Sequence, residues 1–175
     1  MAENRIVVVG TTGSGKTKLA AQLGERWQIP HIELDAIHWG PNWTEMPTDL
    51  FRANLTEALS EDCWVVDGNY SKVRDIVWGR ATTLIWLDYP FSLIFYRLMK
   101  RTLHRVFWRE KLWNNNQESF RNTFMSKDSL IWWFFKTYRR NKQRYPKLFA
   151  EPVYAHLTII RLCSPRATRE WLTKG

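Results

Sequence analysis

The sequence predicts an α/β fold built on a parallel sheet, and three observations support this prediction. Short apolar, β-branched runs alternate with segments of helical periodicity along the 175-residue chain, which indicates βαβ units. The first apolar run, 5–9, leads into a glycine-rich turn and then a helical pattern. Two later apolar runs end at carboxylates, Asp67 and Asp88. Because no repeat or low-complexity linker interrupts the pattern, we expect 1–175 to form a single domain.

The individual elements follow from apolar runs and from the prolines that separate them. Pro30 ends the first helix, Pro90 suits the first turn of a long basic helix, and Ser164 with Pro165 suits an N-cap and first position. The predicted strands are 5–9, 31–34, 64–67, 82–87 and 157–162. The predicted helices are 16–27, 48–61, 71–78, 90–105, 127–144 and one from 165 onward. Residues 106–126 are polar, aromatic and irregular, and we interpret them as an insertion.

Composition places the chain among ordinary globular proteins. It is 45% hydrophobic and 25% charged, and no stretch approaches the roughly 18 apolar residues of a membrane span. Cys63 and Cys163 are the only cysteines and lack metal-ligand spacing. We therefore expect two reduced thiols in a cytoplasmic protein that does not enter a membrane.

The basic charge is concentrated in one part of the chain. The net charge is +9, but residues 1–90 hold 8 Lys/Arg and 12 Asp/Glu, a net charge of −4. Residues 91–150 hold 14 Lys/Arg and 3 Asp/Glu, a net charge of +11. Such a segment suits nucleic acid, acidic lipid or the phosphates of a small substrate.

Residues 10–17 fit the phosphate-binding pattern G-x-x-x-x-G-K-[ST] at every fixed position and have its strand-to-helix context. They are Gly10, Thr11, Thr12, Gly13, Ser14, Gly15, Lys16 and Thr17. Glycines let backbone N–H groups converge on phosphate oxygens, and the helix N-terminus adds its positive dipole end. Lys16 would bridge the β- and γ-phosphates, and the Thr17 hydroxyl would ligate Mg²⁺. The sequence therefore predicts a nucleoside-triphosphate site.

Other polar side chains near strand ends could complete this site. Asp67 could hold Mg²⁺ directly or through water, or could cap the following turn. Asp35 could hydrogen-bond an acceptor hydroxyl or take its proton, or could again cap a turn. His38 could contact the acceptor or be structural, and Trp39 could stack on a planar base or anchor its loop.

Together these residues resemble the nucleoside-monophosphate-kinase branch of the P-loop proteins. More narrowly, they resemble the bacterial adenylate-kinase-like family catalogued as DNA topology modulation proteins. The resemblance covers nearly the whole chain. Besides the P-loop it rests on the stretches 32–39 (IELDAIHW), 64–70 (WVVDGNY), 86–90 (WLDYP) and 110–121 (EKLWNNNQESFR).

The resemblance implies a three-layer α/β/α P-loop kinase fold with a five-stranded parallel sheet, in which 106–126 form a basic helical lid. It also implies ATP and Mg²⁺ as cofactors. Asp67 would help to position the metal, Arg74 would contact the acceptor, and Arg166 would lie against the adenine. The acceptor-binding region lacks a clear nucleoside-monophosphate signature, and the lid lacks the four-cysteine zinc pattern of some adenylate kinases.

Arginines supply the remaining predicted site residues. Arg97, Arg101 and Arg105 share one helical face because they are spaced four residues apart. The resemblance directs this face towards the transferred phosphoryl group and places Arg109 and Arg121 in the lid. Planar guanidinium groups bind phosphate oxygens in pairs and stabilise developing charge. The predicted catalytic set is thus Lys16, Asp35, Arg101, Arg105, Arg109 and Arg121.

Two functions follow as hypotheses. The first is transfer of the γ-phosphoryl of ATP to a small-molecule acceptor, with nucleotides and nucleosides among the candidates. The second is an ATP-switched nucleic-acid-binding regulator that uses the basic 91–150 segment and its tryptophans. No helix-turn-helix, zinc-finger or RNP signature supports the second, so we favour the kinase.

Overall fold

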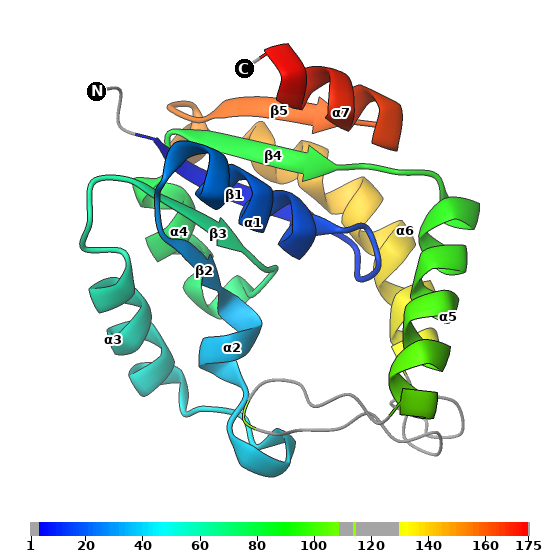
Figure 1. Ribbon diagram of the computed structural model, residues 1–175. Helices are drawn as coiled ribbons and strands as arrows, with labels where there is room; N and C mark the ends of the chain where they lie inside the picture. Colours follow the sequence, from blue (N-terminus) through cyan, green and yellow to red (C-terminus); the bar gives the residue numbers. More distant parts are fainter. Residues whose placement is uncertain (1–3, 109–113, 115–129, 175) are drawn as a thin grey trace.

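The computed structural model describes residues 4–108, 114 and 130–174. Most of the predicted lid, with Arg109 and Arg121, therefore lies outside the described residues. Within them, five parallel strands form one sheet in the order β2-β3-β1-β4-β5 (Figure 1). The predicted α/β class and five-stranded parallel sheet are confirmed.

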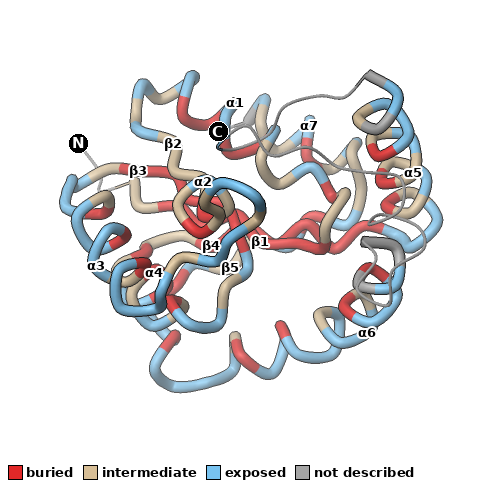
Figure 2. The backbone as a smooth tube through the Cα atoms, turned by 90° about the horizontal axis from the view of Figure 1, so that it is seen from below, coloured by how far each residue is buried: buried red, intermediate tan, exposed pale blue. Residues whose placement is uncertain are grey.

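The strands form where the apolar runs predict them. Their bounds are β1 Arg5–Gly10, β2 His31–Glu33, β3 Trp64–Asp67, β4 Thr83–Leu87 and β5 Thr158–Leu162. The central strands β3, β1 and β4 are almost wholly buried, as expected for strands covered on both faces, whereas the edge strands are only partly buried (Figure 2).

The helices cover both faces of this sheet. Their bounds are α1 Lys16–Trp27, α2 Leu34–His38, α3 Thr48–Ala58, α4 Arg74–Arg80, α5 Phe91–Trp108, α6 Leu130–Phe149 and α7 Pro165–Lys174, with short 3₁₀ turns η1 Pro41–Trp43, η2 Ser71–Val73 and η5 Pro152–Tyr154. As predicted, α7 is capped by the Ser164 hydroxyl, which accepts a hydrogen bond from the Ala167 N–H at 3.1 Å. None of the helices in the described ranges has the length and apolar content required to cross a membrane.

Several boundaries differ from the predictions: α3 ends at Ala58 rather than 61, and α5 continues to Trp108 rather than 105. Strand β2 ends at Glu33, so Asp35 lies in the first turn of α2 rather than at the end of the strand. The predicted 71–78 helix is η2 followed by α4. Helix α6 continues through Pro146 to Phe149, because Tyr145 and Phe149 pack against Trp86 with ring centroids 5.6 and 5.7 Å away.

Two apolar clusters flank the sheet and make the three layers. One contains side chains of α3, α4 and the C-terminal part of α6; the other contains side chains of α1, α5 and Phe134 of α6. Helix α5 lies beyond the carboxyl ends of β1 and β4, beside the turn that joins β1 to α1 (Figure 1). In open α/β sheets this edge is where ligands bind, and it positions the site described next.

Candidate active site

The P-loop, residues 10–17, connects the last residue of β1 to the first turn of α1. Gly13 and Gly15 have φ values of +82° and +93°, a region that side chains with a Cβ rarely adopt. A Cβ on Gly13 would also lie 3.1 Å from the Ile94 carbonyl oxygen of α5. Since α1 begins with no side-chain cap, its first N–H groups are left for an anion.

Asp67 and Thr17 meet beneath this loop. The Thr17 hydroxyl donates to Asp67 Oδ1 at 2.8 Å, and Asp67 is only 2% exposed. His31 Nε2 lies 2.8 Å from the other oxygen, Oδ2. The structure thus brings together the two residues predicted as metal ligands and adds His31, which sequence reasoning missed.

Two arginines of α5 reach the P-loop from the other side. Arg97 donates to the Ser14 carbonyl oxygen at 3.2 Å, and its guanidinium lies 5.4 Å from the Tyr89 ring centroid. Arg101 donates to the Thr12 hydroxyl at 3.4 Å. Arg105 is partly buried one turn further along α5. The predicted arginine face therefore lies towards the loop that would hold the triphosphate.

Asn69 and Tyr70 connect the P-loop to Asp35 of α2. The Asn69 side chain accepts from the Gly10 N–H at 3.4 Å and donates to the Gly10 carbonyl oxygen. The Tyr70 hydroxyl donates to Asp35 Oδ1 at 2.6 Å, and burial and the Asp35 carboxylate raise the pKa of Tyr70. Neither residue was predicted in the site, although their position directly after β3 and Gly68 is a signal for it.

His38 lies in an aromatic cluster behind Tyr70. It is 3% exposed, and its ring centroid is 4.5 Å from that of Tyr70 and 5.0 Å from that of Phe51. Burial lowers its pKa, although the Glu45 carboxylate opposes this shift. Trp39 packs edge-to-face on Trp43 at 5.7 Å, as expected for the loop-anchor alternative.

A small recess lies beside the end of β1 and encloses about 10 Å³, roughly the space of one water molecule. It is lined by Val9, Leu34, Gly68, Asn69, Tyr70, Arg74, Val77, Trp78 and Tyr145. The Arg74 guanidinium lies 5.2 Å from the Trp78 ring centroid, and burial, reinforced by the positive charge of Arg144, lowers its pKa. The predicted acceptor residue Arg74 thus lines a recess that extends to the end of β1, whereas Asp35, His38 and Trp39 do not line it.

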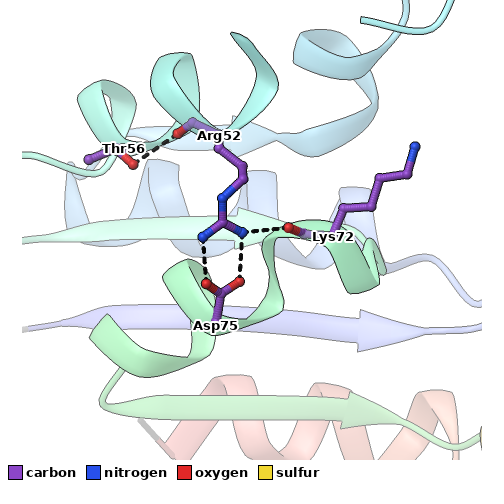
Figure 3. Close-up of polar contacts among 4 residues, drawn as sticks. All are labelled: Arg52, Thr56, Lys72 and Asp75. Carbon is purple, nitrogen blue, oxygen red and sulfur yellow. Dashed lines mark hydrogen bonds and ion pairs between the residues drawn. The ribbon is translucent and has the colours of Figure 1, made fainter. Parts of the chain in front are cut away.

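Charged contacts hold α3 against α4. Arg52 donates to both oxygens of Asp75, at 2.9 and 2.6 Å, and to the Lys72 carbonyl oxygen at 2.6 Å (Figure 3). The Lys72 amine lies 3.5 Å from a Glu45 oxygen. These contacts join the segment after β2 to the segment after β3.

Arg166 lies apart from this arrangement. It is in the first turn of α7, with its side chain 84% exposed, and it donates to Glu170 of the same helix at 2.7 Å. Its guanidinium is therefore directed along α7.

The donor set suits Mg²⁺ and a triphosphate together. Within the described ranges no three His, Cys, Asp or Glu side chains converge as a metal site. Mg²⁺ is usually held by one or two protein oxygens, with water and substrate phosphates completing its octahedron. The Thr17 hydroxyl and the Asp67 carboxylate match that requirement. The N–H groups of the P-loop and of the uncapped first turn of α1 match the phosphates.

Solved structures of kinases share this fold. Shikimate kinase from Aquifex aeolicus superposes with a TM-score of 0.54 at 14% identity, covering 97% of this chain and 94% of that one. A gluconokinase from Sinorhizobium meliloti 1021 gives a TM-score of 0.53 at 18% identity, covering 98% and 93%. Shikimate kinase from Bacteroides thetaiotaomicron gives 0.55 at 15% identity, covering 98% and 95%. No protein-family model and no curated protein sequence matches the chain. The fold is thus that of P-loop kinases.

Proposed function

We propose that this protein is an ATP- and Mg²⁺-dependent phosphotransferase that acts on a small hydroxylated acceptor. The observation that carries the proposal is the partly buried Thr17–Asp67 hydrogen bond of 2.8 Å directly below the P-loop. A phosphate-binding loop alone implies nucleotide binding, whereas a hydroxyl and a carboxylate beneath it add a place for the metal.

Each group around the loop has a defined task in this proposal. The loop N–H groups and Lys16 would bind the β- and γ-phosphates, and Thr17 and Asp67 would hold Mg²⁺. Bound Mg²⁺ supplies neutralisation of phosphate charge. Arg97 and Arg101 already contact the loop, so their positive charge would add to the stabilisation of the transferred group. Arg105, Arg109 and Arg121 would extend this clamp as a lid.

The acceptor would bind beside Asp35 and Arg74, next to the small recess that Arg74 lines. Asp35 would orient the acceptor hydroxyl with the carboxylate oxygen that Tyr70 leaves free, and Arg74 would face an anionic group of the acceptor. The solved neighbours are named for shikimate and gluconate, both hydroxylated carboxylates. Hydroxy acids of this kind therefore join nucleosides and nucleoside monophosphates, the acceptors of adenylate-kinase-like enzymes, in the panel to be tested.

The test is phosphoryl transfer from γ-labelled ATP to that panel in the presence of Mg²⁺. We expect label in one acceptor class, and no transfer by Lys16→Ala. Lys18→Ala is the matched control, because Lys18 is exposed on α1 outside the motif. Absence of transfer to every acceptor, or full activity of Lys16→Ala, would overturn the proposal.

We place the reaction in the cytoplasm, where the free thiols Cys63 and Cys163 would stay reduced.

A further inference from the structure

His31 is a partly buried polar residue of β2 that the proposed roles do not use. In the sheet it pairs with Val65, two residues before Asp67. Side chains two residues apart on a strand share one face, so His31 and Asp67 both lie on the α1 side of the sheet. The side chain of His31 is 17% exposed and that of Asp67 is 3% exposed.

The two oxygens of Asp67 have different partners. Oδ1 accepts from the Thr17 hydroxyl, and Oδ2 lies 2.8 Å from His31 Nε2. The terminal torsion of an aspartate is broad and roughly two-fold, so one hydrogen bond alone would allow the carboxylate to rotate. The second hydrogen bond, from another strand, fixes its plane and leaves Oδ1 beside Thr17.

We infer that His31 is a positioning residue for the Mg²⁺ of the bound nucleotide. It acts by donating from Nε2 to Asp67, which orients the carboxylate towards Thr17 before the metal arrives. Residues that hydrogen-bond to a metal ligand without touching the metal matter for binding: their mutation typically lowers metal affinity 10- to 100-fold. The inference rests on the proposed function, because it presumes that a magnesium–nucleotide complex binds at the P-loop.

Two amide substitutions separate the role of Nε2 from that of the ring. A glutamine side-chain nitrogen reaches about as far as histidine Nε2, whereas an asparagine nitrogen reaches only as far as Nδ1. His31→Gln should therefore keep the hydrogen bond to Asp67, and His31→Asn should lose it while remaining polar. His156→Asn is the matched control, because His156 contacts the Trp78 carbonyl oxygen away from the P-loop.

The experiment measures binding of a fluorescent ATP analogue to the full chain, first in EDTA and then along a Mg²⁺ titration. For His31→Asn we expect the half-saturating Mg²⁺ concentration to rise about 10-fold or more, with affinity in EDTA unchanged. His31→Gln and His156→Asn should stay close to wild type. Thermal unfolding of each variant shows that it is folded.

Three results would overturn the inference. Wild-type Mg²⁺ dependence in His31→Asn would remove the role, and so would His31→Gln behaving like His31→Asn. Equal weakening with and without Mg²⁺ would show a purely structural role. In each of these cases the wild type still binds the nucleotide, whereas failure of the wild type to bind the analogue under any condition would instead refute the proposed function, and the inference with it.

Discussion

Tyr70 and the adjacent Asn69 contact different parts of the site. The Tyr70 hydroxyl binds Asp35, while Asn69 binds Gly10 of the P-loop. Tyr70→Phe keeps the ring contacts with His38 and Phe51 but leaves a carboxylate oxygen without its donor. We expect the free energy of unfolding to fall by about 1 kcal/mol and phosphoryl transfer to fall, while affinity for an ATP analogue is unchanged.

Asn69→Ala is the contrasting variant for this prediction. Because Asn69 holds the first residue of the P-loop, its removal should weaken binding of the ATP analogue. Chemical denaturation and nucleotide titration of both variants check the pair. If Tyr70→Phe weakened nucleotide binding as much as Asn69→Ala does, the division between the two residues would be wrong.

His38 gives a prediction for pH. Burial holds its pKa below the ordinary value of 6.5, so the folded protein keeps His38 neutral where the unfolded chain takes up a proton. The contribution of His38 to the free energy of unfolding is therefore constant above pH 6.5 and becomes destabilising as the pH falls below 6.5. We expect His38→Phe, which retains an aromatic ring, to lose less stability than wild type between pH 7.5 and 5.5.

The measurement is the urea midpoint of both proteins across that range. His104→Phe is the control, because His104 is exposed on α5. Equal pH dependence in wild type and His38→Phe would contradict the prediction.

These residues also show what the sequence could predict at this scale. The P-loop was predictable in full because its chemistry is local: eight consecutive residues carry it. The His31–Asp67 and Tyr70–Asp35 hydrogen bonds join residues 36 and 35 positions apart. They depend on strand register and on the position of α2, which the residue pattern alone does not specify.

At the scale of elements, the ion pair between α3 and α4 has a testable acid dependence. The Arg52 hydrogen bonds hold the pKa of Asp75 below its ordinary value of 3.8. A carboxylate whose pKa is depressed on folding stabilises the protein above that ordinary value, and the contribution is lost as the pH falls through the depressed pKa. Asp75→Asn should therefore be slightly less stable than wild type at pH 7, with the difference vanishing at strongly acid pH.

Urea unfolding at several pH values checks this, with Asp62→Asn as the matched control at an exposed aspartate before β3. The difference should also shrink in high salt, because both side chains of the pair are exposed. A constant difference from pH 7 to pH 2 would show that the ion pair is not its cause.

Element boundaries were predicted well where local signals are strong. Helix α1 matches its predicted range, and Ser164 caps α7. One error lies where packing overrides the local pattern: the helix predicted to end at 144 continues through Pro146 to Phe149, because Tyr145 and Phe149 contact Trp86. Local patterns do not contain such long-range contacts.

At the scale of the whole molecule, the uneven charge has a partial structural explanation. Arg97 and Arg101, within the basic 91–150 segment, contact the P-loop rather than forming an independent basic surface. Part of the +11 charge therefore lies against the P-loop, where it would meet the phosphates of the nucleotide in the proposed function. This arrangement favours the kinase over the nucleic-acid hypothesis.

The site joins elements from across the chain, so nucleotide binding should stabilise the molecule as a whole. The P-loop contacts α5 through Arg97 and Arg101, β3 through Asp67, and the segment after β3 through Asn69. A ligand that binds only the folded state at 100 times its Kd adds about 2.7 kcal/mol. For a chain of this size we expect the Tm to rise by roughly 5–10 °C with a magnesium–ATP analogue.

One thermal-melting assay compares the ligands and the variants that test this prediction. Lys16→Ala should show no rise, and Lys18→Ala should show the full rise. Duplex DNA, which carries phosphodiesters but no triphosphate, should not reproduce the shift. A rise with DNA that survives in Lys16→Ala, and its absence with the nucleotide, would assign the basic segment rather than the P-loop as the binding surface.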